Sequence, residues 1–599
     1  MISLAPRPSV RRPLTRRQVA LVALAALAST VAPLVARAQA VAAPEAPAAA
    51  VGTQTIAVAA LTDYNQLLRE IDFLGELGGR PATSDMIEGM LAFFTGGRGL
   101  EGLDKTRPIG VVLQTDGASF APIGCLPIAD LTPVLELAEN FGFEPVEIGA
   151  GVYELELPEQ TVYFQQTGDW TFVAPTPLAL TQAPADPSSM LKKLVGTYDL
   201  GVTLYAQNVP DMYRQIALEQ LRQGMEEGLV QQEGETEEDF QARRELAEAQ
   251  IEQLGDLIEG LDVVTIGWSI DSEGKRTFID AELTGADGSD MALAMDAYKD
   301  PTSGVAGFHR PTAAMSLLTS GVTPPELLEK QKGQTEAAIE MVRTQIDKAL
   351  QEQIEAGKLP DDPDVQAAIE GATDDLVDVY ADMLRTGRIE IGGSLDLAGE
   401  GFDLIVGGYV VDPSKVESAF KKLAEAASKD EKFPGVEWGY ATHSGVTLHG
   451  MTVPVPAEAG QLREAVGESV RVIMGVGNER VYFAAGPRGE ESLKAAIDGS
   501  AALTDKTILP GELIVSVGQV LGAAEKVAPP NAAPMIGLIL DAMKDTPPGA
   551  DRLVITSEAI DRGMRVRYLI EEGVLKAIGK AAATAAAMQQ QRGGPPGGF

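Results

Sequence analysis

The sequence predicts an α+β protein with largely antiparallel sheets, built from two homologous halves at about 52–303 and 304–588. Three observations carry this prediction. A unit made of a short apolar strand, two amphipathic helices, a pair of strands and a closing helix occurs four times. The paired strands are separated only by short polar turns, which is typical of antiparallel hairpins. Each half also contains a further group of strands that the other half repeats.

Each of the four units opens with a short apolar strand, at 55–61, 200–206, 314–319 and 512–517. Its later pair of strands surrounds a polar turn. These turns are Thr115-Asp116-Gly117, Asp271-Ser272-Glu273-Gly274, Ala398-Gly399-Glu400-Gly401 and Asp561-Arg562-Gly563. Because Gly adopts the positive φ angles that tight turns require, and β-forming residues flank each turn, we expect four β-hairpins.

Between the strands of each unit the sequence predicts a helical hairpin. Segments rich in Gly or Pro, which interrupt helices, divide each helical pair at 78–81, 234–236, 359–363 and 529–531. Apolar residues recur at three- and four-residue steps, which predicts helix faces turned toward a core. The clearest stripes are Ala247, Ile251, Leu254, Ile258 and Leu261; Ile339, Val342, Ile346 and Leu350; and Val365, Ile369, Leu376, Tyr380 and Met383. Thr236, with Asp239 three residues later, resembles a capping box that opens a helix.

A closing helix is expected in each unit, at 130–140, 290–299, 413–427 and 572–587. Strands at 146–148, 151–153, 162–164 and 171–175 match those at 436–438, 445–447, 470–472 and 481–485. We therefore expect four β-αα-ββ-α modules, two in each half, with one sheet insert per half. The Gly- and Pro-rich tail at 589–599 should be disordered.

The first forty residues have the pattern of a cleavable export signal. Arginines without any acidic residue precede an apolar run at 19–36, and Ala38-Gln39-Ala40 supplies the small-x-small pattern that signal peptidase recognises. We expect residues 1–40 to be removed, a Pro/Ala-rich spacer at 41–51, and a mature protein in the periplasm or outside the cell. An uncleaved membrane anchor is the alternative, against which Pro33 and the cleavage pattern argue. Arg16-Arg17 leaves the secretory and twin-arginine routes both open.

The chain is strongly acidic. Its 86 acidic and 48 basic residues give a net charge of −38, and loss of a signal with six arginines and no acid takes this to −44. Such a surface repels phosphate backbones and argues against nucleic-acid partners. No second apolar stretch of comparable length occurs, so the mature chain should have no transmembrane segment. The single cysteine, Cys125, lies in an apolar run, and we expect a buried, inert thiol.

No group of residues has the spacing of a known active site. A two-residue loop at Ser444-Gly445 would place His443 opposite Val446 and His449 opposite Tyr440, on opposite faces of the hairpin, where one zinc ion cannot bind both. We interpret them as surface histidines; His309 is the third histidine of the chain. The acidic clusters Asp361-Asp362-Pro363-Asp364 and Asp287-Gly288-Ser289-Asp290 lack EF-hand spacing and precede expected helices, whose N-termini acids favour. We therefore predict no catalytic, cofactor-binding or metal-binding residue, and no cofactor.

The export signal, the acidity, the near-absence of cysteine and the repeated strand-hairpin-helix units resemble uncharacterised exported bacterial proteins that are grouped under domains of unknown function. The resemblance covers most of the mature chain, contains no diagnostic motif and implies no catalytic residue. The sequence favours a non-enzymatic envelope protein that binds or scaffolds an unknown partner through repeated surfaces. Two alternatives stay open: a carrier of an apolar ligand held between sheet and helices, and a hydrolase that uses carboxylates. A deep apolar cavity would favour the carrier, and a polar cleft with converging carboxylates or histidines would favour the hydrolase.

Overall fold

The computed structural model describes residues 53–591 except 159, 232–235, 358–361, 398–400, 461–462 and 464–465. These residues divide into two compact units. The first reaches Ile258 and includes Val263–Ser272, and the second takes Glu259–Asp262 and everything from Glu273. The expected export signal and spacer lie outside the described residues.

The first unit is built on an antiparallel sheet. Its strands are β1 (Gln54–Leu61), β2 (Ile109–Thr115), β3 (Phe120–Leu126), β4 (Val146–Gly149), β5 (Val152–Glu156), β6 (Thr161–Thr167), β7 (Trp170–Ala174), β8 (Leu200–Tyr205) and β9 (Leu261–Asp271). They pair in the order β4-β5-β6-β7-β3-β2-β1-β8-β9. The helices are α3 (Tyr64–Leu77), α4 (Thr83–Phe94), α5 (Thr132–Asn140), α6 (Pro177–Leu180), α7 (Ser188–Val195), η1 (Ala206–Asn208), α8 (Asp211–Gly228) and α9 (Glu237–Gly260).

The second unit is also built on antiparallel strands. Its strands are β10 (Arg276–Gly285), β11 (Met315–Val322), β12 (Arg388–Asp396), β13 (Asp403–Tyr409), β14 (Glu437–His443), β15 (Val446–Pro454), β16 (Ser469–Val476), β17 (Arg480–Ala485), β18 (Gly511–Ser516), β19 (Arg552–Ile560) and β20 (Gly563–Glu571). They pair in the order β14-β15-β16-β17-β13-β12-β11-β18-β19-β20-β10. The helices are α10 (Asp290–Asp296), η2 (Ala306–Phe308), α11 (Pro325–Lys330), α12 (Lys332–Glu355), α13 (Pro363–Thr386), α14 (Pro413–Ala427), η3 (Ala457–Ala459), α16 (Gly489–Leu503), α17 (Val517–Val527), α18 (Ala533–Met543) and α19 (Glu572–Gln591).

The α+β class with antiparallel sheets is confirmed. The expected opening strands correspond to β1, β8, β11 and β18, and the expected helical hairpins to α3–α4, α8–α9, α12–α13 and α17–α18. α9 begins directly after Thr236, the expected cap. Parts of the breakers at 234–236 and 359–363, and of the turn at 398–401, lie outside the described residues.

The compact units divide at 272/273, because β10 pairs along its length with β20 of the second unit. Two further features of the structure were not expected from the sequence. α19 continues to Gln591 and so includes the first three residues of the expected tail, whose remainder is not described. α7 and α16 were not expected as elements of the fold.

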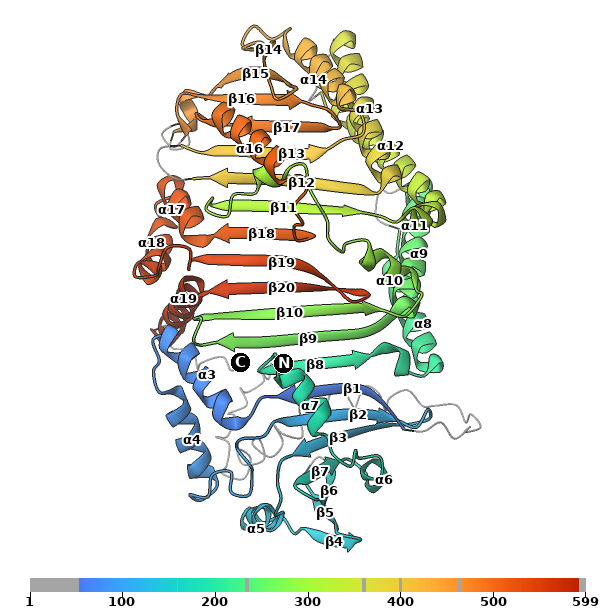
Figure 1. Ribbon diagram of the computed structural model, residues 1–599, viewed down its shortest axis with the longest axis vertical. Coiled ribbons are helices and arrows are strands. Elements are labelled where there is room, and N and C mark those ends of the chain that lie inside the picture. The colour runs from blue at the N-terminus through green and yellow to red at the C-terminus, as the bar shows by residue number, and fades with distance from the viewer. Residues whose placement is uncertain are drawn as a thin grey trace, which may run out of the picture. The chain divides into compact units, whose positions relative to one another are not determined.

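In the second unit a large hydrophobic core lies under η2 and α16, and a smaller cluster that includes Val379, Val416 and Met474 packs on the other face of the sheet. Leu318, Ile405, Leu448 and Ile473 point into the large core and pack with residues of η2 and α16 such as Phe308. Figure 1 shows α16 crossing the sheet over β13 and β17. The chain at η2 approaches the strands so closely that a Cβ on Gly392 would lie 2.6 Å from the Val305 carbonyl oxygen, which explains why glycine occupies this strand position.

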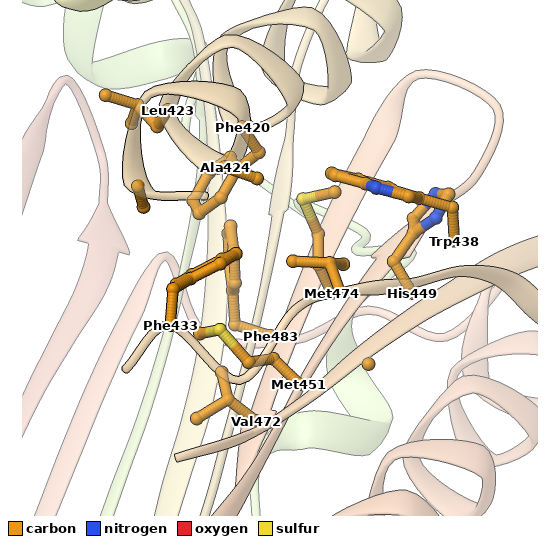
Figure 2. Close-up of a pocket in the computed structure, with 13 residues that line it drawn as sticks. Phe420, Leu423, Ala424, Phe433, Trp438, His449, Met451, Val472, Met474 and Phe483 are labelled. Atoms are coloured by element: carbon orange, nitrogen blue, oxygen red, sulfur yellow. The ribbon is translucent and has the colours of Figure 1, made fainter. Parts of the chain in front are cut away.

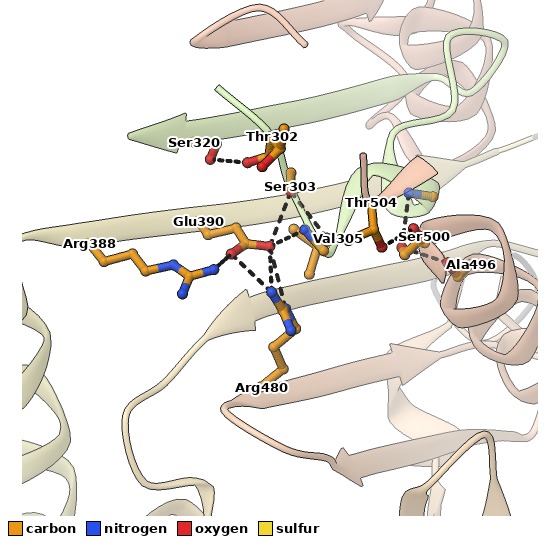
Figure 3. Close-up of polar contacts among 12 residues, drawn as sticks. Thr302, Ser303, Val305, Ser320, Arg388, Glu390, Arg480, Ala496, Ser500 and Thr504 are labelled. Atoms are coloured by element: carbon orange, nitrogen blue, oxygen red, sulfur yellow. Dashed lines mark hydrogen bonds and ion pairs between the residues drawn. The ribbon is translucent and has the colours of Figure 1, made fainter. Parts of the chain in front are cut away.

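A buried carboxylate fixes the segment that leads into η2 (Figure 3). Glu390 of β12 is 1% exposed and accepts hydrogen bonds from the Ser303 hydroxyl (3.2 Å) and the Gly304 N–H. Its charge is matched by Arg388 at 2.8 Å and Arg480 at 3.3 Å. A buried charge without such partners would be costly, so this cluster holds the segment against the sheet.

Among the described residues, no helix combines the length and the apolar character that crossing a bilayer requires.

Candidate functional site

The sheet of the second unit has an inverted distribution of polarity near β10 and β20. Side chains alternate between the two faces of a strand, and the apolar set normally faces the core. In β10, however, Ile279 is 43% exposed whereas its neighbour Asp280 is fully buried. In β20, Tyr568 is 44% exposed beside Arg567, which binds Asp280. The apolar face of these strands is therefore the one that is left uncovered.

Strand pairing extends this apolar face across the unit. Ile279 pairs with Tyr568, Tyr568 with Ile555, Ile555 with Leu513, and Leu513 with Leu317, so all five side chains share one face. We call this surface the open face. It consists of Ile279, Tyr568, Ile555, Leu513, Leu317, Met315, Val515, Leu553, Ile570, Leu395, Leu404 and Val406, each exposed or half-buried. At about 4.8 Å per strand, it is about 29 Å wide from β10 to β13.

Ion pairs on the opposite face fix the register of β20, and so fix which side chains of these strands lie on the open face. Arg567 donates to both carboxylate oxygens of Asp280 at 2.7 Å. Arg565 donates to Glu282 at 2.7 Å and to Glu558 at 3.1 Å. A one-residue slip of β20 would separate these pairs and leave Asp280 buried without a counter-charge, so the register that exposes the open face is strongly held.

The first unit has an apolar face of the same kind. Leu200, Val202 and Leu204 alternate along β8 and are exposed, while Gly201 and Thr203 between them are buried. Val202 pairs with Ile266 of β9 on one side and with Ala59 of β1 on the other. Uncovered apolar strands are thus a property of both units.

One helix covers the far end of the open face and leaves an apolar groove beneath it. The row through Leu317 continues by strand pairing through Gly393, Val406, Phe483 and Met474 to His449. α14 packs over the last of these residues and partly covers an open apolar cavity of about 270 Å³ (Figure 2). The cavity is lined by Phe420, Leu423, Ala424, Ala427, Phe433, Val436, Trp438, His449, Gly450, Met451, Val472, Met474 and Phe483.

His449 is the polar side chain of this groove. It is 4% exposed, its Nδ1 accepts a hydrogen bond from the Gly439 N–H at 3.0 Å, and its ring meets the edge of Trp438. Gly439 has a φ of 58°, a left-handed conformation that glycine adopts without strain. Nε2 has no hydrogen-bond partner and lies 3.6 Å from the nearest carboxylate oxygen of Glu417. Burial lowers the pKa of His449, which Glu417 partly opposes, so the neutral imidazole is favoured.

The interpretation of His449 as a surface histidine is wrong. The hairpin itself is as expected: His443 pairs with Val446 across Ser444-Gly445. The register then shifts between Glu437 and Ala441, which brings the Gly439 N–H to His449, and α14 closes over the ring. A covering helix is a tertiary contact, and the local pattern of the hairpin contains no signal for it.

The other two histidines lie in separate surroundings. His443 Nε2 is 2.9 Å from Asp498 of α16, which also accepts a hydrogen bond from the Ser444 hydroxyl. His309 follows η2, and its Nε2 lies 3.4 Å from Glu512 without a hydrogen bond. Burial lowers the pKa of His309 and Glu512 raises it. No partner is shared between them, so the structure does not bring the histidines together.

The acidic clusters have structural roles where they are described. Asp362 caps α13 by accepting the Asp364 N–H and also binds Lys429 at 2.8 Å. In the other cluster Ser289 caps α10, and Asp290 contacts Lys330. Asp361 lies outside the described residues. Within the described ranges no group of three or more His, Cys, Asp or Glu side chains is placed to hold a metal ion.

Cys125 lies in the core of the first unit, as expected. It is fully buried, and burial raises the pKa of its thiol to about 12. A thiol in this state is a poor nucleophile at neutral pH.

Two buried carboxyl groups of the first unit lie near one another. Asp199 accepts hydrogen bonds from the Gln66 side chain at 2.7 Å and the Ile270 N–H at 2.6 Å, so it ties α3 to β9. Glu70 is buried, and both this burial and the charge of Asp199 raise its pKa. The raised pKa favours a protonated Glu70 and lowers the electrostatic cost of the pair. Sequence reasoning did not single out either residue, because their approach depends on how α3 packs.

Comparison with known proteins adds no further constraint: no protein-family model, no curated protein and no solved structure matches this chain.

Proposed function

We propose that this protein is an exported, non-enzymatic binding protein that carries an apolar ligand on the open face and in the adjoining groove under α14. The observation that carries the proposal is the exposure of apolar side chains along one face of a central sheet, while the fully buried Asp280 and its ion pair with Arg567 lie on the other face. Large exposed apolar patches on soluble proteins mark interaction sites.

The energetics favour covering this face. Ile279, Met315, Leu317, Leu404 and Tyr568 of the open face, and Leu283 on the same side of β10, are each between 37% and 44% exposed. Completing the burial of such a side chain contributes about 1 kcal/mol, and the six together about 6 kcal/mol before the costs of association are subtracted. Contacts made in the groove add to this favourable contribution.

Charge and shape favour a small apolar ligand over a second copy of the chain. Two copies face to face would each bring a net charge of −38, or −44 after loss of the signal, and would repel one another. The apolar row also continues beneath α14 into a cavity of about 270 Å³, which a small molecule can enter and a flat protein surface cannot. The groove thus supports the carrier alternative more than a purely scaffolding role.

We further propose that the chain is a duplication of one ten-strand unit. The pairings β1–β2, β1–β8, β2–β3 and β3–β7 recur as β11–β12, β11–β18, β12–β13 and β13–β17. Cleavage after Ala40 stays part of the proposal on the strength of the sequence pattern. N-terminal sequencing of the exported protein should find Val41; a chain that starts at Met1 would overturn the export signal.

The test of ligand binding uses the mature chain, 41–599, and N-phenyl-1-naphthylamine, a neutral apolar dye whose fluorescence rises on leaving water. A charge placed on the open face by Leu317→Asp should weaken dye binding at least tenfold. Thr556→Asp is the matched control, since Thr556 pairs with Arg567 on the opposite face, and it should bind the dye like the native chain. Equal binding by the two variants, or no binding by the native protein, would contradict the proposal.

A further inference from the structure

The groove under α14 has a single polar side-chain group among aliphatic, aromatic and thioether groups, apart from the indole of Trp438. That group is the imidazole of His449, whose Nε2 is buried and without a hydrogen-bond partner. A buried polar atom left unpaired costs about 1–3 kcal/mol, so its presence needs an explanation.

The hydrogen bond at Nδ1 determines what Nε2 can offer. A backbone N–H only donates, so the Gly439 N–H requires a lone pair on Nδ1. In the neutral imidazole the proton then resides on Nε2, which makes Nε2 a donor. A ligand that satisfies it must bring a hydrogen-bond acceptor.

The charges around His449 indicate that this ligand is neutral. Glu417 lies 3.6 Å from Nε2, too far for a hydrogen bond but near enough to repel an anion. Lys421 is held by Glu417 at 2.6 Å, so its charge is already matched. A cationic ligand would place its positive charge against the Nε2–H, which is a donor and cannot accept a hydrogen bond from it. A carbonyl or ether oxygen avoids both conflicts.

The first unit shows that the hairpin does not need a histidine at this position. Both hairpins turn on two residues with positive φ, Ala150-Gly151 and Ser444-Gly445. Counting from these turns, Leu155 of β5 occupies the position of His449 in β15, and it is buried in an apolar cluster. A leucine at this position is therefore sufficient for packing in the first unit. The histidine of the second unit adds a hydrogen-bond donor, and burying its imidazole costs desolvation free energy.

We propose that His449 is a specificity-determining residue that donates a hydrogen bond from Nε2 to a neutral, compact apolar ligand carrying a carbonyl-type acceptor. This inference rests on the proposed binding function and names the ligand class for its groove. A volume of about 270 Å³ is at the lower limit of small-molecule sites and suits a fused ring pair or a short branched chain. A longer apolar molecule would continue past Phe483 along the open face, since these residues share one row.

The test compares two probes of nearly equal shape, 2-acetylnaphthalene and 2-ethylnaphthalene, of which only the first has an acceptor. Their dissociation constants are measured for the native mature chain, for His449→Leu, which introduces the residue type of Leu155, and for His449→Gln, which keeps an N–H donor. One hydrogen bond to a buried donor predicts that His449→Leu weakens the acetyl probe about tenfold relative to the ethyl probe. His449→Gln should retain part of this preference. Infrared spectra should show the carbonyl stretch of the bound acetyl probe at lower frequency in the native chain than in hexane, and this measurement does not depend on any variant folding.

The outcomes separate this inference from the proposed function. If His449→Leu leaves the ratio of the two dissociation constants unchanged, or if the bound carbonyl stretch equals that in hexane, the proposed role of His449 is wrong. Binding of the ethyl probe would in that case still support the groove as an apolar binding site. If N-phenyl-1-naphthylamine binds and neither naphthalene probe does, the binding site is the open face alone and not the groove. If no apolar probe binds at all, the binding function itself fails.

Discussion

Leu317 and Leu318 are adjacent in β11, and their truncation measures directly which face of the sheet is covered. Leu318 is 5% exposed and packs in the core that η2 and α16 cover, whereas Leu317 is 38% exposed on the open face. Removing a buried leucine side chain costs its transfer energy together with a cavity, so Leu318→Ala should lower the free energy of unfolding by about 3 kcal/mol. Leu317→Ala leaves no enclosed cavity and forfeits only partial burial, so it should cost about 1 kcal/mol.

The assay is differential scanning calorimetry of the mature chain, with each variant compared by the melting transition of the second unit. With an unfolding entropy of about 2.1 cal/mol/K per residue, 1 kcal/mol moves the melting temperature of a unit of this size by about 1.5 °C. Leu318→Ala should therefore lower it by about 4–5 °C and Leu317→Ala by about 1–2 °C. Equal losses for the two variants would refute the reasoning, because they would mean that Leu317 is buried as deeply as Leu318.

Three further predictions follow from particular contacts. Glu390→Gln should cost about 3 kcal/mol, because Arg480 and Arg388 lose the buried charge that they match, while Glu558→Gln on the surface should cost less than about 1 kcal/mol in the same urea titration. A fragment 273–591 should unfold cooperatively, and a fragment 304–591, which lacks β10 as the partner of β20, should be markedly less stable by circular dichroism; equal stability would place the division of the chain at 303/304. Burial lowers the pKa of His449, so the unfolded chain binds a proton at this residue more readily than the folded chain does. Relative to His449→Leu, the native protein should therefore keep its stability above pH about 6.5 and lose it progressively as the pH falls below that value. Parallel curves of stability against pH for the two proteins would contradict this.

Local patterns were sufficient to predict most of the secondary structure. The hairpin at Ser444-Gly445 was placed with the correct pairing of His443 and Val446, because a two-residue turn with positive φ specifies its own register. Helices such as α14, at Pro413–Ala427, were bounded by an Asp-Pro start and by apolar periodicity. These signals act over a few residues, which is why they can be read from one sequence.

The candidate site depends on contacts that no local pattern contains. Alternation in 276–285 and 563–571 tells which side chains share a face, but it does not tell which face other elements will cover. Ile279 and Tyr568 would be assigned to a core by that pattern, yet no element in the described part of the chain covers them, and they are 43% and 44% exposed. His449 lies in the groove only because α14, more than twenty residues earlier in the chain, folds over it. A signal was nevertheless present: a polar histidine where the matching hairpin has Leu155.

Photo-labelling maps bound apolar molecules residue by residue and would therefore locate the ligand on this protein. The mature chain is irradiated with a neutral, diazirine-bearing naphthyl ketone, digested and sequenced by mass spectrometry, with excess unlabelled 2-acetylnaphthalene as competitor. We expect competed labels on the open face and in the groove, on residues such as Leu317, Met474 and Tyr568, and few on the opposite face around Leu318 and Arg567. Labels spread equally over both faces, or labels that the competitor does not reduce, would contradict this expectation.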